Sequence, residues 1–394
     1  MTKFLMKYRL LIKIFFAIIL GFLIGRFTPE AVVEIFISIN ILIGKLMTFS
    51  IPLIIIAFVT KGISSIGKSS GKLLVITLIT SYVFMFIASC FSYTVGTRVF
   101  PNFLELNSFD FKGIINQAKE IPGFIKQINF PPVMDVFSSL ILAFIIGIGV
   151  SKINGNIIKN TLIEFHDIIS WFVQKVIVGL LPLYVVGTFA KLSESGQFIN
   201  VLSVFSKLFI VIILIHLTVI IFQFLLAGIL ANKNPLILIK NIIPAYLSAI
   251  ATQSSVAVIP VNMKCTKENG VSDDVNNFVI PLCATIHLSG SIISITSCTI
   301  AMMFMTGMPI SFINLFPFIL NICIVMIAAP GIPGGAILAA AGVLQSMLGF
   351  DNNMISMMIT LHVIQDGFGT ACNISGDSAI AVIIDSLYNK EKNK

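Results

Sequence analysis

The sequence predicts an all-α integral membrane protein, and two observations support this prediction. Of the 394 residues, 57% are hydrophobic and only 11% are charged, with a mean hydropathy of +1.03, whereas soluble domains carry about 25% charged residues. Apolar runs long enough, or nearly long enough, to cross a hydrocarbon core of about 30 Å recur along the chain. Because these runs are apolar on all sides, they predict helices and not barrel strands. They occupy residues 10–27, 35–59, 73–95, 136–150 and 201–230.

The positive charges predict the topology. The formal net charge is +8, but Lys and Arg stand at the ends of apolar runs and form no separate basic domain, so a nucleic-acid partner is not expected. Basic residues within 3–13, 61–72 and 390–394 place both termini in the cytoplasm, because cytoplasmic loops are enriched in Lys and Arg. The segment 101–132 carries both signs and is expected outside. These features together predict a multi-pass protein of the cell (inner) membrane.

Two interruptions follow the fifth run. The polar cluster at 252–255 and the Gly-Pro cluster at 330–335 each divide a pair of short apolar pieces. Broken pairs of this kind predict re-entrant hairpins, whose irregular backbone is tolerated at membrane depth only beside protein or a water-filled cavity. An exterior loop explains one such cluster equally well, but two clusters beside an acid-bearing helix favour hairpins. The pieces are 241–250, 256–263, 312–329 and 336–348.

Between the hairpins, the apolar segment 276–308 is interrupted by Gly and hydroxyl residues at 285–291. An unwound stretch of this kind frees carbonyl oxygens, and hard cations prefer oxygen ligands. The same hydroxyls could instead pack against neighbouring helices. Judged from this segment by itself, the packing interpretation is the favoured one.

The last apolar segment carries acids in a regular pattern. Read as a helix, residues 362–377 place Asp366, Thr370, Asn373 and Asp377 on one stripe, because the spacings are three or four residues. A carboxylate facing lipid is costly, so acids within the membrane indicate a substrate or ion pathway. The stripe therefore predicts a transporter.

Other classes of site find little support. The six cysteines form no CxxC pair, so neither a disulfide nor a zinc site is expected. His166 and His216 lack acidic or Cys neighbours at ligand spacing and are expected to be structural or interfacial. No nucleophile stands in a recognisable elbow or HExxH setting, so no catalytic residue and no enzyme is predicted. A ring of like ligands, as a channel would need, is also missing.

Three motifs connect the chain to a known family. They are Thr252-Gln253-Ser254-Ser255-Val256-Ala257-Val258-Ile259-Pro260, Gly331-Ile332-Pro333-Gly334-Gly335 and the run from Asp366 to Asp377. In their order and spacing, the chain resembles the dicarboxylate/amino acid:cation symporters over nearly its whole length. This family includes the glutamate transporters and neutral amino acid exchangers. Residues 36–58 and 281–286 are similar to further helices of the same family.

The resemblance implies a glutamate-transporter-like elevator fold with about eight transmembrane helices plus two re-entrant helical hairpins. It also implies a homotrimer. Residues 1–231 would mainly form scaffold and trimerisation helices, with the third helix contributing to transport. Residues 232–394 would form the transport core, with the hairpins as gates. A receptor or non-transporting scaffold of the same fold remains an alternative.

The resemblance also implies a substrate site for an amino acid. Asp366 would take the ammonium, Thr370 and Asn373 would bond polar groups, and Ser255 with the backbone near Gly331 and Ile332 would hold the α-carboxylate. His362, one turn before Asp366, is a substrate contact or a structural histidine. The remaining substrate-site candidates are Ser254, Ser291 and Gly369.

One departure from the family pattern concerns the substrate. Members that take acidic substrates have an arginine three residues after the ammonium-binding Asp, where this chain has Gly369. A second substrate carboxylate would lack its bidentate partner. We therefore expect a small neutral amino acid such as serine, threonine or alanine, with acidic amino acids or dicarboxylates as the alternative.

The other departure concerns the cation. The family's Asn-Met-Asp-Gly-Thr signature here reads His287-Leu288-Ser289-Gly290-Ser291, so a cation-binding carboxylate is missing. We expect sodium to be the coupling ion, at fewer ions per cycle, and no cofactor. Proton coupling remains the alternative, because the unperturbed pKa of a histidine near 6.5 lies in the working range. The candidate cation-site residues are Thr80, Ser81, Cys283, Thr285, His287, Ser289, Asn373 and Asp377.

Overall fold

The computed structural model describes residues 9–65, 71–104, 128, 130–153, 156–196, 198–327, 329 and 334–392. Within these ranges the regular elements are all helical, as the uniformly apolar runs predicted. Gly331, Ile332 and most of the segment expected outside, 101–132, lie beyond the described residues.

The helices of the N-terminal half are long. After α4 the chain makes a short 3₁₀ turn, η1 (Phe100–Asn102), and α8 runs into α9 through a π-helical turn, η2 (Val173–Ile177). The α-helices are α2 (Arg9–Phe27), α3 (Glu30–Ser65), α4 (Gly71–Val99), α7 (Val136–Lys152), α8 (Ile157–Phe172), α9 (Val178–Glu194) and α10 (Phe198–Ala231).

In the C-terminal half, short helices come in pairs. The first predicted hairpin is α11 with α12, and the second is α15 with α16. The segment between them is broken into α13 and α14, and α17 carries the acidic stripe. Their bounds are α11 (Pro235–Thr252), α12 (Ser255–Glu268), α13 (Asp273–Ile286), α14 (Ser289–Met305), α15 (Phe312–Ile327), α16 (Gly335–Leu348) and α17 (Asn352–Lys392).

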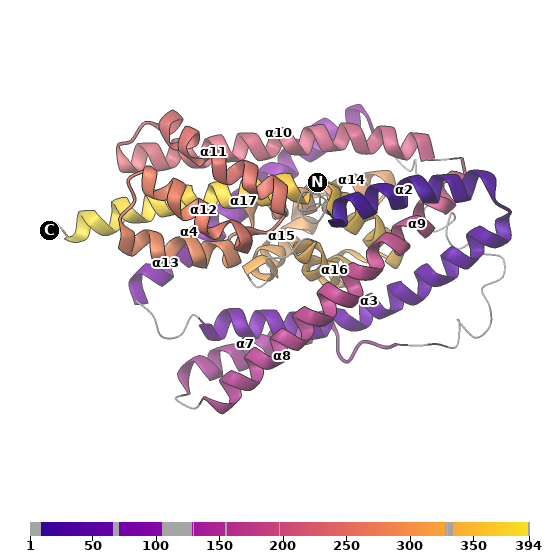
Figure 1. Ribbon diagram of the computed structural model, residues 1–394, viewed down its shortest axis with the longest axis horizontal. Coiled ribbons are helices and arrows are strands. Elements are labelled where there is room, and N and C mark those ends of the chain that lie inside the picture. Colours follow the sequence, from indigo (N-terminus) through magenta and orange to yellow (C-terminus); the bar gives the residue numbers. More distant parts are fainter. Residues whose placement is uncertain are drawn as a thin grey trace.

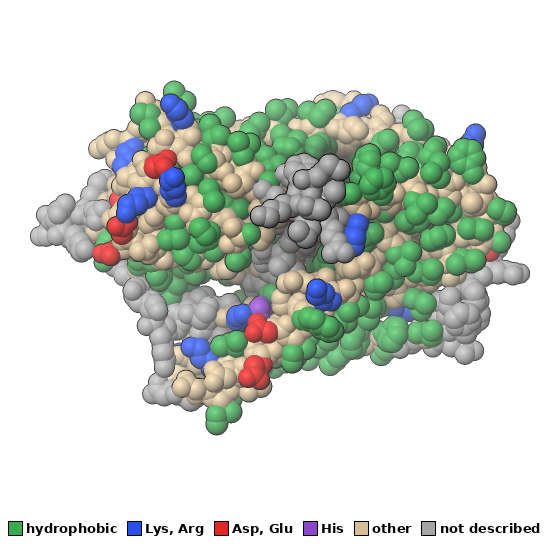
Figure 2. Space-filling view, in the orientation of Figure 1, with side chains coloured by type: hydrophobic (Ala, Val, Ile, Leu, Met, Phe, Trp, Pro, Cys, Tyr) green, Lys and Arg blue, Asp and Glu red, His purple; other side chains and the backbone are tan. Residues whose placement is uncertain are grey.

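Seven of the described segments are long and apolar enough to cross a membrane. One of the seven is α11, which packs against α12 as an arm of the first hairpin. The 19-residue α2 and the 17-residue α7 are the other apolar helices outside the hairpins. Counting α11 as a hairpin arm leaves six such segments, and α2 and α7 would bring the number to the approximately eight expected from the sequence. Side chains such as Ile229 and Ile313 are exposed, and Figure 2 shows apolar side chains spread widely over the visible face.

The helices pack in two groups. Helices α2, α3, α7, α8 and α9 contact one another, whereas α4 packs on α14, and α10 packs along α17 and α11. Figure 1 shows α3, α7 and α8 along one long side of the molecule and α10 and α11 along the other. From the sequence we expected the third helix, α4, to pack with the C-terminal helices. The resemblance assigned residues up to 231, which include α10, mainly to the scaffold, but α10 also packs with the C-terminal helices.

The centre of the second group is buried within the molecule. Every residue of α14 from Ser289 to Met303 is buried, and α17 is buried almost throughout its described side chains. Small residues bring these two helices together: a Cβ on Gly290 would collide with the carbonyl oxygen of Gly369. Polar groups on α14 and α17 therefore face each other and not the bilayer.

Candidate functional site

The helix break predicted at 285–291 is confirmed. His287 and Leu288 leave the helical region of the backbone map, and α14 starts again at Ser289. The first amides of α14 point at α17, because Gly290 N donates to Asn373 Oδ1 at 2.7 Å and Ser291 N donates to the same oxygen at 3.3 Å. Asn373 therefore caps the positive end of α14 and orders the break.

The stripe on α17 forms as predicted. Asp366, Thr370, Asn373 and Asp377 are at most 5% exposed. Asn373 Nδ2 also donates to Ser291 Oγ at 3.1 Å, which joins two predicted substrate-site residues from different helices. Gly369, where the resemblance implies an arginine in members that take acidic substrates, lies against Gly290, and a Cβ there would make only ordinary contacts at 3.5–3.6 Å.

Asp366 connects α17 to the second hairpin. Its Oδ2 accepts a hydrogen bond from Gly334 N at 2.7 Å, and its Oδ1 lies 3.5 Å from His362 Nε2. Gly334 has φ +72°, a conformation that favours glycine, and α16 begins at the next residue. A carboxylate at the start of a helix is electrostatically favoured. The acid predicted to bind the substrate's ammonium thus also holds the tip of a predicted gate.

The tip of the first hairpin approaches the same place. Helix α11 ends at Thr252, Gln253 adopts φ +52°, and the Ser254 side chain caps α12 by accepting from Ala257 N at 3.4 Å. Ser255 is buried at the start of α12. A Cβ on Gly367 would meet the Ile250 carbonyl oxygen at 2.9 Å, so the last turn of α11 touches α17 one residue from Asp366.

Only some of the candidate cation-site residues lie close to one another. His287 Nδ1 donates to Asp377 Oδ1 at 2.9 Å, and both side chains are completely buried. Ser81 Oγ lies 3.7 Å from Cys283 Sγ, which brings α4 to the end of α13. Thr80 donates to its own helix at Ile76 O, 2.8 Å away. Thr285 is exposed and donates to Leu282 O, so its side chain is not brought to the others.

Two polar side chains on α10 were not singled out as site residues. Gln223 Nε2 donates to Ser289 Oγ at 3.4 Å, and His216 Nε2 donates to Gly290 O at 2.9 Å. Both are 1% exposed. His216 is interfacial, as expected, but its interface is with the first turn of α14. The sequence signal that could have indicated them is a glutamine and a histidine within a 34-residue, largely apolar helix, because polar side chains in such a helix usually face the protein interior.

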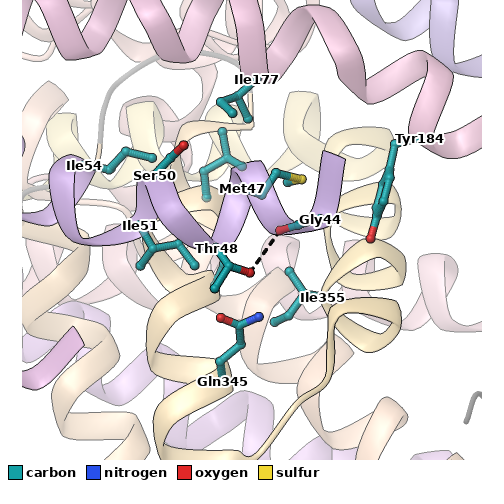
Figure 3. Close-up of a pocket in the computed structure, with 12 residues that line it drawn as sticks. Gly44, Met47, Thr48, Ser50, Ile51, Ile54, Ile177, Tyr184, Gln345 and Ile355 are labelled. Carbon is teal, nitrogen blue, oxygen red and sulfur yellow. Dashed lines mark hydrogen bonds between the residues drawn. The ribbon is translucent and has the colours of Figure 1, made fainter. Parts of the chain in front are cut away.

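A pocket lies elsewhere, between the two helix groups (Figure 3). It is a small cavity of about 10 Å³ among α3, α9, α16 and the start of α17. Its wall includes Met47, Tyr184, Gln345 and Ile355, and Thr48 donates within α3 to Gly44 O. None of the described residues that line it is charged.

The chain is similar to known transporters over nearly its whole length. The family model described as the sodium:dicarboxylate symporter family matches residues 10–387. A serine/threonine transporter, SstT, of Acinetobacter baylyi is 25% identical over 413 residues, spanning 98% of this chain and 99% of that protein. The protein of the same name from Streptococcus agalactiae is 27% identical, spanning 99% of this chain and all of its own length.

Proposed function

The chain belongs to the sodium:dicarboxylate symporter family, and on this basis we propose that it is a secondary active transporter which couples entry of serine, threonine or a similar small neutral amino acid to sodium. It is a multi-pass membrane transporter and not an enzyme. The relatives named serine/threonine transporters match it from end to end, which favours this substrate class over dicarboxylates.

The observation that carries the proposal is the position of Asp366. This buried carboxylate lies where both hairpins meet α17, bonded to Gly334 of the second hairpin and next to the contact of Gly367 with the first. A substrate ammonium there would form a charge-assisted pair in a site with little water. Ser255 is buried at the start of α12, and a helix N-terminus suits the α-carboxylate. We therefore propose Ser254, Ser255 and Ser291 as substrate residues beside Thr370 and Asn373.

Charge also argues for a neutral side chain. Lys191 is the only buried Lys or Arg among the described residues; it lies on α9 and pairs with Glu194 at 2.6 Å. A second substrate carboxylate would therefore be taken out of water without a basic partner, which is costly. This supports serine or threonine over aspartate.

The proposal is tested by uptake of labelled serine into proteoliposomes under an inward sodium gradient. We expect accumulation that disappears when potassium replaces sodium at fixed pH, and that unlabelled threonine suppresses more strongly than aspartate. Robust aspartate uptake unaffected by serine would contradict the neutral-substrate proposal. Uptake that ignores sodium but follows a pH gradient would contradict sodium coupling.

For the cation, we propose that Asp377 supplies the carboxylate, together with main-chain carbonyls near Cys283 and Asn373. Ser289 and Ser81 offer further buried oxygens on facing helices. Because Ser289 stands where relatives have an acid, we expect fewer sodium ions per cycle. Thr80 and Thr285 contribute less in this proposal, since both hydroxyls donate to their own helices.

We further propose that the two helix groups are the two parts of an elevator. Helices α2, α3, α7, α8 and α9 would be the static scaffold and trimer contact, and α4 with α10 to α17 would move. Thr188 Oγ1 lies 3.1 Å from Ser356 Oγ across the boundary, and the pocket of Figure 3 lies on the same boundary. Both termini are proposed to be cytoplasmic.

Gly369→Arg is expected to change substrate preference. A Cβ at this position would meet Gly290 and Ser291 only at 3.5–3.6 Å, an ordinary contact, and the guanidinium would supply the missing bidentate partner for a second carboxylate. We expect serine uptake to fall and aspartate to become a better competitor by about tenfold, equivalent to about 1.4 kcal/mol. Competition assays with labelled serine and labelled aspartate measure the change.

Gly369→Met is the matched control, because it adds a side chain of similar length without charge. It should reduce serine uptake without improving aspartate. An equal gain of aspartate binding in both variants would show that bulk, and not charge, sets the preference.

A further inference from the structure

His287 is fixed against the proposed sodium carboxylate. Its backbone N donates to Cys283 O at 2.8 Å, which ends α13, and its Nδ1 donates to Asp377 Oδ1 at 2.9 Å. Neither side chain is exposed. Among the described residues, His287 is the only basic group within ion-pair distance of Asp377.

The chain is shaped to hold this imidazole. A Cβ on Gly376, the residue before Asp377, would collide with His287 Cε1, so a glycine is required where the ring lies against α17. Phe84 on α4 approaches the ring edge-on, with 6.3 Å between the centroids. Phe84 of α4 and Gly376 of α17 thus border the ring on two sides, which favours the orientation that faces Asp377.

The other polar atoms around this pair are only partly engaged. Asp377 Oδ2 and His287 Nε2 are completely buried and have no hydrogen-bond partner among the described residues. The same holds for Gln223 Oε1, which would lie 2.8 Å from a Cβ on Gly376. A buried carboxylate oxygen without a partner is costly, so Oδ2 is suited to a cation. Oδ1 is already bonded to the imidazole.

We propose that His287 sets the cation affinity of this transporter by competing with sodium for Asp377. This inference rests on the proposed function, in which Asp377 is the sodium carboxylate. A sodium ion held by Asp377 would find Oδ2 without a partner, whereas it would have Oδ1 only if the imidazole gave that oxygen up. Relatives with the full signature have an asparagine at this position, whose shorter side chain also carries an oxygen that can serve as a ligand. His287 therefore weakens sodium binding in addition to the loss of the acid at Ser289.

The test is a sodium titration of the purified full-length protein without amino acid. Thermal unfolding is followed as sodium chloride replaces choline chloride at constant ionic strength, for the wild type, His287→Asn and His287→Ala. Ligands that bind the folded state raise the unfolding temperature. We expect the sodium concentration for half-maximal stabilisation to fall about tenfold or more in both variants, equivalent to about 1.4 kcal/mol. His166→Asn on α8, in the other helix group, should leave it unchanged.

An unchanged or higher half-maximal sodium concentration in both His287 variants would overturn the inference. If one variant does not fold, the other decides. Serine uptake, measured separately, distinguishes failure of the proposed function from failure of the role of His287. If the wild type takes up serine with sodium but the His287 variants show an unchanged sodium titration, only the role of His287 is contradicted. A shifted titration without serine uptake in any protein removes only the proposed substrate.

Discussion

Asp366→Asn is expected to reduce sodium-driven serine uptake at least about 30-fold. Asparagine has nearly the same shape, and its side-chain oxygen can still accept the hydrogen bond from Gly334 N, so the contact with the second hairpin is kept. The substrate's ammonium, however, loses its anionic partner in a buried site. Removing one member of a buried charge pair costs about 2–5 kcal/mol, which corresponds to roughly 30-fold to several thousand-fold. Initial rates of labelled serine uptake, at equal amounts of reconstituted protein, measure the loss.

The control is Asp273→Asn at the start of α13. Asp273 pairs with Lys267 at 2.8 Å, but its side chain is 65% exposed, and exposed pairs contribute little. Uptake by this variant should match that of the wild type. If Asp366→Asn also transports at the wild-type rate, the ammonium binds elsewhere and the resemblance to the family misassigns the site.

The sequence predicted the features that depend on local pattern. The hairpins follow from short apolar pieces around a polar or Gly-Pro cluster, the break before Ser289 from Gly and hydroxyl residues, and the acidic stripe from spacings of three and four. Each of these is decided within about 30 residues of chain. This is why the helical order could be derived before any tertiary contact was known.

Contacts between distant segments could not be derived in this way. The bond of Asp366 to Gly334 and that of His287 to Asp377 join different helices, and helical periodicity does not specify which helix is the neighbour. For the same reason, Gln223 stood out as a polar residue within the apolar α10, but the sequence did not specify that it would reach Ser289. Thr285 was a cation-site candidate from its place in the interrupted segment, but its side chain is exposed on α13.

The crossing of α14 and α17 yields the second large effect. Gly290→Ala is expected to destabilise the fold and to abolish serine uptake. The new Cβ would collide with Gly369 O and lie 2.6 Å from Cys372 Cβ, and neither obstacle is the end of a flexible side chain. Overpacking of this kind costs about 1–3 kcal/mol or more. Any separation of the helices would also stretch the bonds from Gly290 N and Ser291 N to Asn373. Thermal unfolding of the purified protein and serine uptake measure the two effects.

Gly369→Ala tests the same crossing from the other side. Its Cβ would meet Gly290 C at 3.5 Å, an ordinary contact, and alanine stabilises a helix interior by about 0.8–1 kcal/mol relative to glycine. This variant should therefore unfold at the wild-type temperature or above it. Equal destabilisation by both substitutions would mean that the helices tolerate no side chain at the crossing. A stable Gly290→Ala would instead mean that α14 can move away from α17, and the stripe would then lack the fixed wall that the proposed substrate site requires.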